Sequence, residues 1–318
     1  MKNTIPKALE TKRGNRLGKR IWDHRYNYLM MLPGLVFLFI FSYVPIYGLV
    51  LAFKDYSFRG GILGSDWADM NGLEHFIELF EEKDFWNVTW NTILISIGRI
   101  VIEFPVPIIL AVLMNEVRAK KFKKTVQSVM YFPYFISWVI IGSMVFSLFS
   151  YNRGAVNELL FNLTGKRFNF LIDDTFFLIL LFISSIWKGA GYSMILYMAA
   201  ITNIDTDLYD AATIDGCNRI QKIQHVTLPG ISIMVVTMLI LACGGIMNAG
   251  FDQIFNLYNS SVYDVADILD TYIYRIGLRE LNFSIGTAVG LFKSVINFVL
   301  LMVVNHICKR INGTGIYT

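Results

Sequence analysis

Charged residues are scarce in this chain: Asp, Glu, Lys and Arg together make up 16% of its 318 residues. Soluble globular domains usually carry about 25%. The mean hydropathy is positive, at +0.51. This composition argues against an ordinary water-soluble domain and favours a membrane protein.

Cysteine and histidine are also rare, with three and four residues respectively. Cys217, Cys243 and Cys308 show no CxxC spacing, so the sequence predicts no disulfide framework. The histidines are scattered and form no H-E-x-x-H motif. No metal site is therefore predicted.

The chain lacks the phosphate-binding loop G-x-x-x-x-G-K-[ST], by which a protein cradles a nucleotide. The nearest stretch, GNRLGKR at 14–20, is one residue short. We assign no catalytic residue and no bound cofactor to this chain, and we do not expect it to be an enzyme.

Six apolar runs are long enough to cross a bilayer, which needs about 20 helical residues. The runs lie at 29–53, 88–114, 126–149, 176–201, 231–250 and 284–307. They are continuous and do not alternate in polarity as the strands of a membrane barrel do. The sequence thus predicts an all-α polytopic membrane protein with six transmembrane helices.

Lys and Arg are distributed unevenly between the two sides of the predicted bundle. Seventeen lie in the N-terminal tail, the second-to-third and fourth-to-fifth connections and the C-terminus, against eight in the other connections. Positive charge marks the cytoplasmic side, so we expect a basic cytoplasmic tail at 1–27, a six-span membrane domain at 28–310 and a cytoplasmic tail at 311–318. We interpret the tail charge as a topology signal at the bilayer and expect no nucleic-acid partner.

The connection at 202–230 is polar although long apolar runs flank it. Asp205 or Thr206 suits a helix N-cap, and Gly216 suits the left-handed residue that ends a helix. We expect a second short helix after the glycine, ending at Leu228-Pro229. An amphipathic connector lying in the membrane interface is the simplest alternative for such a segment.

The spacing within this connection is more specific. Asp210-Ala211-Ala212 is followed by three residues and Gly216, then by nine residues, Val226, one residue and Leu228-Pro229. The pattern resembles the EAA loop of binding-protein-dependent ABC importer permeases. The sequence departs from it at Asp210, where the family usually has Glu, so the charge is kept on a shorter side chain.

The resemblance covers nearly the whole chain from the first span onward. WKGAGYSMILYMAAI at 187–201, GFDQIFNLYN at 250–259 and FSIGTAVGLFKSVINFVLL at 283–301 look like the LplB-like subgroup of polysaccharide and oligosaccharide permeases. The resemblance implies a type I ABC importer permease fold and a bacterial cell membrane location. It also implies a second permease subunit, two cytoplasmic ATPases that bind ATP and Mg, an extracellular solute-binding protein and a sugar substrate, which the subgroup resemblance makes an oligosaccharide.

By this resemblance the 202–230 loop is the coupling helix that docks on the ATPase. The docking residues that it implies are Tyr209, Asp210, Ala211, Ala212, Asp215, Gly216, Leu228 and Pro229.

Polar side chains inside the predicted spans are costly and usually paired or functional. Arg99 and Glu103 are four residues apart on one helix face, and we expect them to neutralise each other. Lys188 could contact a carbonyl, a lipid headgroup or an anionic sugar, and Lys293 is expected to extend toward the interface. Aromatic and amide side chains suit sugars, so the predicted substrate-pathway residues are Trp187, Lys188, Tyr192, Asn248 and Phe251.

Three alternatives remain open at this stage. A secondary carrier driven by an ion gradient would need no ATPase, and a membrane scaffold would carry no solute. An ABC permease could also serve an amino acid or phosphate instead of a sugar.

Overall fold

The structure is a computed structural model that describes residues 22–312. The predictions for most of the basic N-terminal tail and for residues 313–318 lie outside the described residues. Helices dominate the described part, and the only strands in it are two that form a two-residue antiparallel ribbon. The all-α prediction is therefore confirmed apart from this ribbon.

The elements of the first half run in chain order as follows, η marking 3₁₀ or π turns: α2 (Arg25–Leu38), η2 (Phe39–Tyr43), η3 (Val44–Phe53), β1 (Lys54–Asp55), α3 (Gly61–Gly64), β2 (Asp66–Trp67), α4 (Asp69–Gly72), α5 (Glu74–Glu81), α6 (Lys83–Gly98), η4 (Arg99–Glu103), α7 (Pro105–Glu116), α8 (Lys120–Tyr131), η5 (Phe132–Phe135) and α9 (Trp138–Phe149).

The second half contains α10 (Ala155–Thr164), η6 (Phe170–Ile172), α11 (Asp174–Thr202), α12 (Thr206–Ile214), α13 (Arg219–Lys222), η7 (Ile223–Thr227), α14 (Leu228–Gly230), α15 (Ser232–Gly244), η8 (Ile246–Asn248), α16 (Phe251–Leu257), η9 (Ser260–Val262), α17 (Tyr263–Ala266), α18 (Leu269–Ile273), η10 (Tyr274–Arg279) and α19 (Phe283–Asn312).

Four of the predicted spans are continuous helices that are long and apolar enough to cross a membrane. They run over Arg25–Phe53, Lys83–Glu116, Asp174–Thr202 and Phe283–Ile307. Each lies within a few residues of its predicted run, because an uninterrupted apolar stretch of this length has one stable form in lipid, the helix. The other two spans are bent pairs of helices, which bring the total to six.

The bent pairs differ from the straight helices that the apolar runs predict. The run at 126–149 is divided at 136–137, where α8–η5 and α9 meet at 96°. Ser137 starts α9, because its hydroxyl accepts a hydrogen bond from the Ile140 amide at 3.4 Å. The run at 231–250 is α-helical only as far as Gly244 and is followed by the 3₁₀ turn η8, and α14 meets α15 at 60°.

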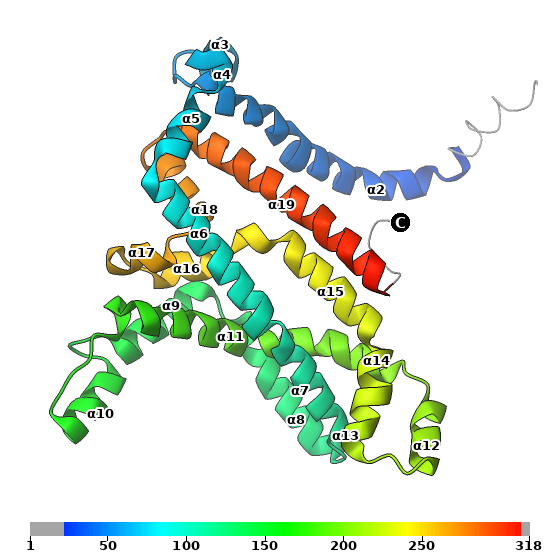
Figure 1. The fold of residues 1–318 in the computed structure, drawn as a ribbon. Coiled ribbons are helices and arrows are strands. Elements are labelled where there is room, and N and C mark those ends of the chain that lie inside the picture. Colours follow the sequence, from blue (N-terminus) through cyan, green and yellow to red (C-terminus); the bar gives the residue numbers. More distant parts are fainter. Residues whose placement is uncertain (1–21, 313–318) are drawn as a thin grey trace, which may run out of the picture.

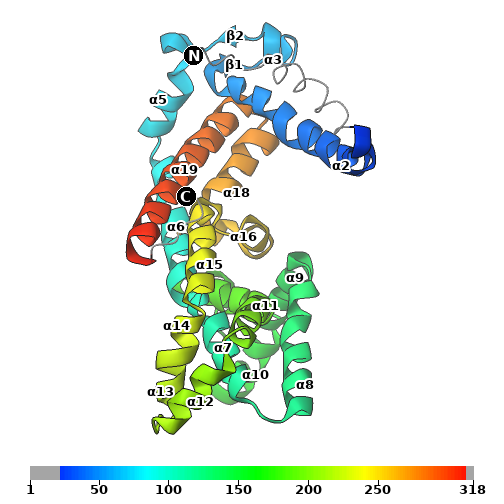
Figure 2. The ribbon, with the colours of Figure 1, turned by 90° about the vertical axis from the view of Figure 1, so that its right-hand side faces the viewer.

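The first and last spans meet at the end that carries the β1–β2 ribbon, and from there α2 and α19 diverge (Figure 2). The η3 segment packs on α19, whereas most of α2 carries exposed apolar side chains. Such a surface is stable in lipid or against another membrane helix, but not in water.

The long helix α11 is the centre of the bundle and packs on α7 and α8. Gly191 permits the closest of these approaches, because a Cβ placed there would overlap the backbone carbonyl of Met130 on α8. Buried Met194, Tyr197 and Ile201 continue the same contact surface toward the end of α11.

The β1–β2 ribbon and α3–α5 lie at the opposite end of the molecule from α12–α14 (Figures 1 and 2). Lys54 anchors this end, because its buried ammonium donates to the carbonyls of Ile62, Leu63 and Ser65 at 2.9–3.2 Å. The two ends of the bundle therefore carry different ordered structures, one a compact cap and the other a helical elbow.

We expect Gly191→Ala to weaken the α8–α11 contact by about 1–3 kcal/mol, because the added methyl has no space beside Met130. Gly189→Ala is the matched control on the same helix, since open space surrounds that position. The melting temperature of the purified protein in detergent should fall for Gly191→Ala alone. Equal melting temperatures for the two variants would contradict the packing described.

Candidate functional site

The elbow at 202–230 is a defined structure made of two helical arms. The Asp205 side chain caps α12 by accepting from the Asp207 amide at 3.0 Å. Gly216 has a φ of +79°, the left-handed conformation that glycine adopts without strain. Asn218 and Gln221 then form a reciprocal capping box that starts the second arm. The two short helices and their glycine elbow are as predicted.

Two side-chain contacts hold the arms of the elbow together. The Tyr209 hydroxyl lies 2.9 Å from the Thr227 hydroxyl, and the Lys222 ammonium donates to Thr213 at 2.6 Å. These contacts link the two arms of the elbow within the chain.

The prediction that Leu228-Pro229 ends the second helix is wrong. The helix continues through both residues to Gly230, and Leu228 has helical angles of φ −64° and ψ −45°. A π turn at Ile223–Thr227 comes directly before them. The wider turn shifts the hydrogen-bond register, so the missing amide hydrogen of Pro229 falls at a junction and not inside a regular turn.

Most of the predicted docking residues are accessible on the elbow. Asp210, Ala211, Asp215, Gly216, Leu228 and Pro229 are exposed, whereas Tyr209 and Ala212 are half-buried. Leu208, Ile214 and Ile220 are large apolar residues that are 54%, 86% and 66% exposed beside them. Large apolar side chains that are this exposed are typical of a surface that contacts another protein or the membrane.

Lys188 stabilises the sharp bend between η5 and α9. Its ammonium donates to the Tyr134 carbonyl at 2.7 Å and to the Ile136 carbonyl, two groups that the interrupted helix leaves without intrahelical partners. The ammonium also lies 5.5–5.6 Å from the ring centres of Tyr134 and Trp138. Tyr192, one turn further along α11, stacks on Tyr134 with ring centres 4.0 Å apart.

A second break, between α15 and α16, interrupts the fifth span. Ala249 and Gly250 have φ values of +28° and +86° there. The freed backbone groups are bonded by side chains of neighbouring spans: Ser96 donates to the Ile246 carbonyl, and Asn297 accepts from the Met247 amide at 3.0 Å. The chain thus remains hydrogen-bonded without being helical.

Arg99 lies against this second break. It pairs with Glu103 at 3.4 Å, which confirms the predicted ion pair. Its shorter contacts are to Gln253 at 2.6 Å and Ser185 at 3.0 Å. A Cβ on Gly250 would lie 2.5 Å from the Arg99 guanidinium, so only glycine leaves room for it.

The expectation that Lys293 extends toward the interface is wrong. Its ammonium pairs with Asp270 at 2.5 Å, and its side chain is only 13% exposed. Asp270 on α18 pairs with the lysine within the fold, so the side chain does not extend to the interface.

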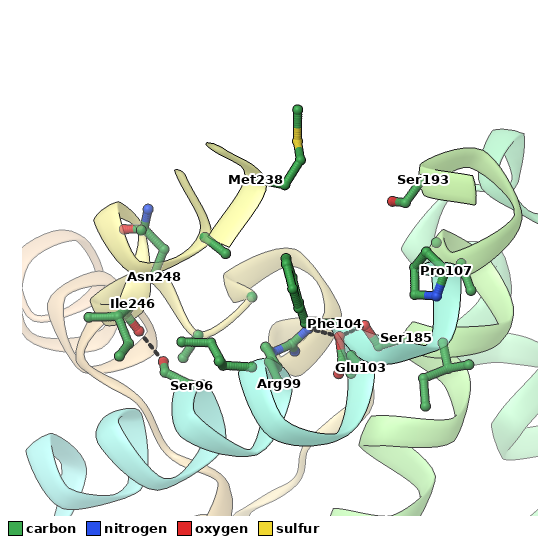
Figure 3. A pocket seen from close by; sticks show the side chains of 18 of the residues that line it. Ser96, Arg99, Glu103, Phe104, Pro107, Ser185, Ser193, Met238, Ile246 and Asn248 are labelled. Atoms are coloured by element: carbon green, nitrogen blue, oxygen red, sulfur yellow. Dashed lines mark hydrogen bonds and ion pairs between the residues drawn. The ribbon is translucent and has the colours of Figure 1, made fainter. Parts of the chain in front are cut away.

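Two cavities adjoin the Arg99 cluster. One, of about 390 Å³, lies between α6–η4–α7, α11 and α15, and the other, of about 340 Å³, lies beside α16. In Figure 3, Arg99, Glu103 and Ser185 point toward one another at the wall of the larger cavity, with Ser193 and Met238 on other walls. A third cavity of about 600 Å³ lies between α9 and the segment after α16.

The predicted pathway residues fall into two groups. Asn248 lines both cavities beside Arg99, and Phe251 lines the smaller one. Trp187, Lys188 and Tyr192 line neither of the two, because they face the α8–α9 bend or the outer surface of α11. Their assignment to the pathway stays a prediction.

Sequence reasoning missed Ser96, Ser185, Gln253 and Gly250 as members of the site. Gln253 is 1% exposed, yet its amide is fully engaged with Leu181, Ser184 and Arg99. A buried amide three residues after a glycine that interrupts an apolar run is the signal that could have found it.

Comparison with known proteins places these features in a family. Residues 104–313 match the model of the binding-protein-dependent transport system inner membrane component. The matched segment contains the elbow, both bends and most of the cavity walls. The chain belongs to this family.

Two curated relatives from Bacillus subtilis cover nearly the whole permease. The polygalacturonan/rhamnogalacturonan transport system permease protein YteP is 43% identical over 95% of this chain and 93% of its own length. Protein LplB is 39% identical over 92% of this chain and 91% of its own. The predicted likeness to LplB-type permeases is confirmed.

Solved structures agree with this assignment. A bacterial ABC transporter involved in the import of the acidic polysaccharide alginate matches with a TM-score of 0.85 and 37% identity, over 93% of this chain and 99% of that chain. The alginate transporter in complex with an alginate pentasaccharide-bound periplasmic protein matches equally well, over 95% of this chain. The permease therefore has the type I ABC importer fold and is a transport subunit of the inner membrane, not an enzyme.

We expect Lys188→Met to destabilise the permease by about 1–3 kcal/mol, because two carbonyls inside the membrane lose their donor. Tyr192→Phe keeps the ring that stacks on Tyr134 and should change stability by less than about 0.5 kcal/mol. Thermal unfolding in lipid nanodiscs measures both. If Lys188→Met unfolds at the wild-type temperature but transports poorly, the ammonium serves the solute or a lipid and not the bend.

Proposed function

We propose that this permease imports an oligosaccharide as one of two membrane subunits of an ATP-driven transporter. Its partners in this proposal are a second permease, two cytoplasmic ATPases that bind ATP and Mg, and an extracellular solute-binding protein that delivers the sugar. The permease contributes the pathway and the docking surface, and the energy comes from the ATPases.

The observation that carries the proposal is the elbow at 202–230. It combines the EAA spacing with a two-armed structure, exposed apolar residues and an exposed acidic residue at Asp210. A chain without a nucleotide-binding loop needs such a surface to receive force from a separate ATPase.

The substrate class is supported by the relatives and by the chemistry of the cavities. YteP belongs to a polygalacturonan/rhamnogalacturonan transport system, and the matched solved transporter is involved in the import of alginate. The cavity walls here combine hydroxyl and amide groups, at Ser96, Ser185, Ser193 and Asn248, with the rings of Phe104 and Tyr197. Polar groups that fix orientation on a mainly apolar wall are typical of sites for small polar molecules.

The proposed orientation follows the charge distribution. Both termini and the elbow lie on the cytoplasmic side, and the β1–β2 cap and the segment from α16 to η10 lie outside, where the binding protein docks. The permease domain then extends over 28–310, with short tails at either end. The separation of the cap from the elbow along the bundle supports this arrangement (Figure 1).

We expect Gly216→Asp to uncouple transport, because it places a carboxylate at the centre of the ATPase interface. Gly216→Asn is the matched control: Asn and Asp both tolerate the left-handed conformation, and only the charge differs. The measurements are co-purification of the ATPases and sugar-stimulated ATP hydrolysis. The loss of one interface anchor commonly costs about 2 kcal/mol, or about thirtyfold in affinity.

Normal co-purification and normal uptake by Gly216→Asp would contradict the docking assignment. Loss of both with Gly216→Asn as well would show that the backbone conformation matters and the charge does not.

A second experiment separates the proposal from an ion-driven carrier. In proteoliposomes containing the full assembly, uptake of polygalacturonan or alginate fragments should require internal ATP and persist when ionophores dissipate ion gradients. Uptake that survives removal of the ATPases and collapses with ionophores would overturn the proposal.

A further inference from the structure

Arg99 joins three elements that are distant in sequence. From the start of η4 its guanidinium donates to Ser185 on α11 at 3.0 Å and to Gln253 on α16 at 2.6 Å. Gln253 is in turn fixed by the Leu181 carbonyl at 2.6 Å. The arginine is thus a crosslink between two spans and the segment that follows the second break.

The same arginine separates the two cavities. Both are lined by Arg99, Asn248 and Gly250, and no other residue is common to the two linings. The cavity between the spans and the cavity beside α16 therefore meet at this guanidinium, the side chain of Asn248 and the bare backbone of Gly250. Moving the guanidinium away from Gly250 would join them into one channel.

The cluster also contains an unpaired donor and an unpaired acceptor. Arg99 Nε and Glu103 Oε1 are buried and have no hydrogen-bond partner. Leaving such groups unpaired costs free energy, so a ligand that bonded to both groups would recover that cost. Figure 3 shows Arg99 and Glu103 adjacent at the cavity wall, so a molecule that displaced the guanidinium would meet both groups.

The chemistry of the pair selects its ligand. A hydroxyl group accepts a hydrogen bond and donates one, which matches one free N–H and one free carboxylate oxygen. A carboxylate has no proton to donate and would be repelled by Glu103. A neutral ion pair of this kind suits a sugar hydroxyl, even on a saccharide that also carries acidic groups.

We propose that Arg99 is the septum between two consecutive parts of the saccharide path, and that Arg99 and Glu103 bind sugar hydroxyl groups when the septum opens. Both roles rest on the proposed function: the septum needs only its orientation in the membrane, whereas the binding role also needs its saccharide substrate. Opening exchanges the Arg99–Gln253 bond for bonds to the sugar, while Gln253 keeps its bonds to the Leu181 carbonyl and to Ser184, so that α16 stays attached to α11.

The septum is tested by thiol reactivity in the assembled transporter. Cys217, Cys243 and Cys308 are replaced by Ser, and Ser193→Cys places one thiol on the wall of the larger cavity. A membrane-impermeant thiol reagent added outside should label this thiol at least tenfold faster when Arg99→Ala is also present. The matched control, Asp252→Cys on the wall of the smaller cavity, should react at the same rate with either residue at position 99.

Unchanged labelling of the Ser193→Cys thiol would overturn the septum, whatever the substrate proves to be. This assay needs no saccharide, so it remains decisive if the oligosaccharide proposal fails.

The binding role is tested by uptake of a uronate oligosaccharide and of its carboxyl-reduced neutral counterpart. Arg99→Lys and Glu103→Gln should each lower the initial uptake rate of both sugars by the same factor, about tenfold, the effect of one hydrogen bond to a charged group. Co-purification of the ATPases at wild-type yield verifies that each variant folds.

A loss confined to the uronate sugar would overturn the hydroxyl assignment in favour of carboxylate recognition. No loss for either sugar would overturn the binding role. If the wild-type assembly takes up neither sugar, the oligosaccharide proposal itself fails, and the thiol assay still decides the septum.

Discussion

A backbone that leaves the helical path inside a membrane must find hydrogen-bond partners, because lipid offers none. This constraint explains the polar residues within the spans. Lys188 donates hydrogen bonds to two carbonyls at the α8–α9 bend. At the break after α15, Ser96 donates to a carbonyl and Asn297 accepts from an amide. Replacing these side chains by apolar ones would leave backbone groups at the breaks without hydrogen-bond partners, which costs free energy.

The same breaks create the functional geometry. An unbroken fifth span would fill the space where the two cavities meet, whereas the break at 244–250 leaves glycine backbone there, with Arg99 packed directly on it. The elbow at 202–230 continues into α15, which ends at this break. In the proposed mechanism, one short helix, α15, would carry a displacement of the elbow to the junction of the cavities.

Sequence patterns predicted some features well and others poorly, for physical reasons. Continuous apolar runs located the four straight spans, because a chain in lipid satisfies its backbone hydrogen bonds by forming a helix. The EAA spacing located the elbow, because its glycine takes the left-handed conformation that other residues rarely adopt. The apolar run did not predict the 96° bend at 136–137, because a straight span and a bent span have the same apolar composition. The partner of Lys293 was also missed, because Asp270 lies 23 residues away and only the fold brings the two together. Gln253 joined the site for the same reason.

The central claim is that the saccharide passes through the broken segment of the fifth span. A cryo-electron microscopy map of the assembled transporter in nanodiscs, trapped with a non-hydrolysable nucleotide and an oligosaccharide, tests it most directly. The account predicts saccharide density in contact with Asn248 and the Arg99 guanidinium, with the break at 244–250 retained. Density elsewhere, with lipid or a straightened helix occupying these cavities, would contradict it.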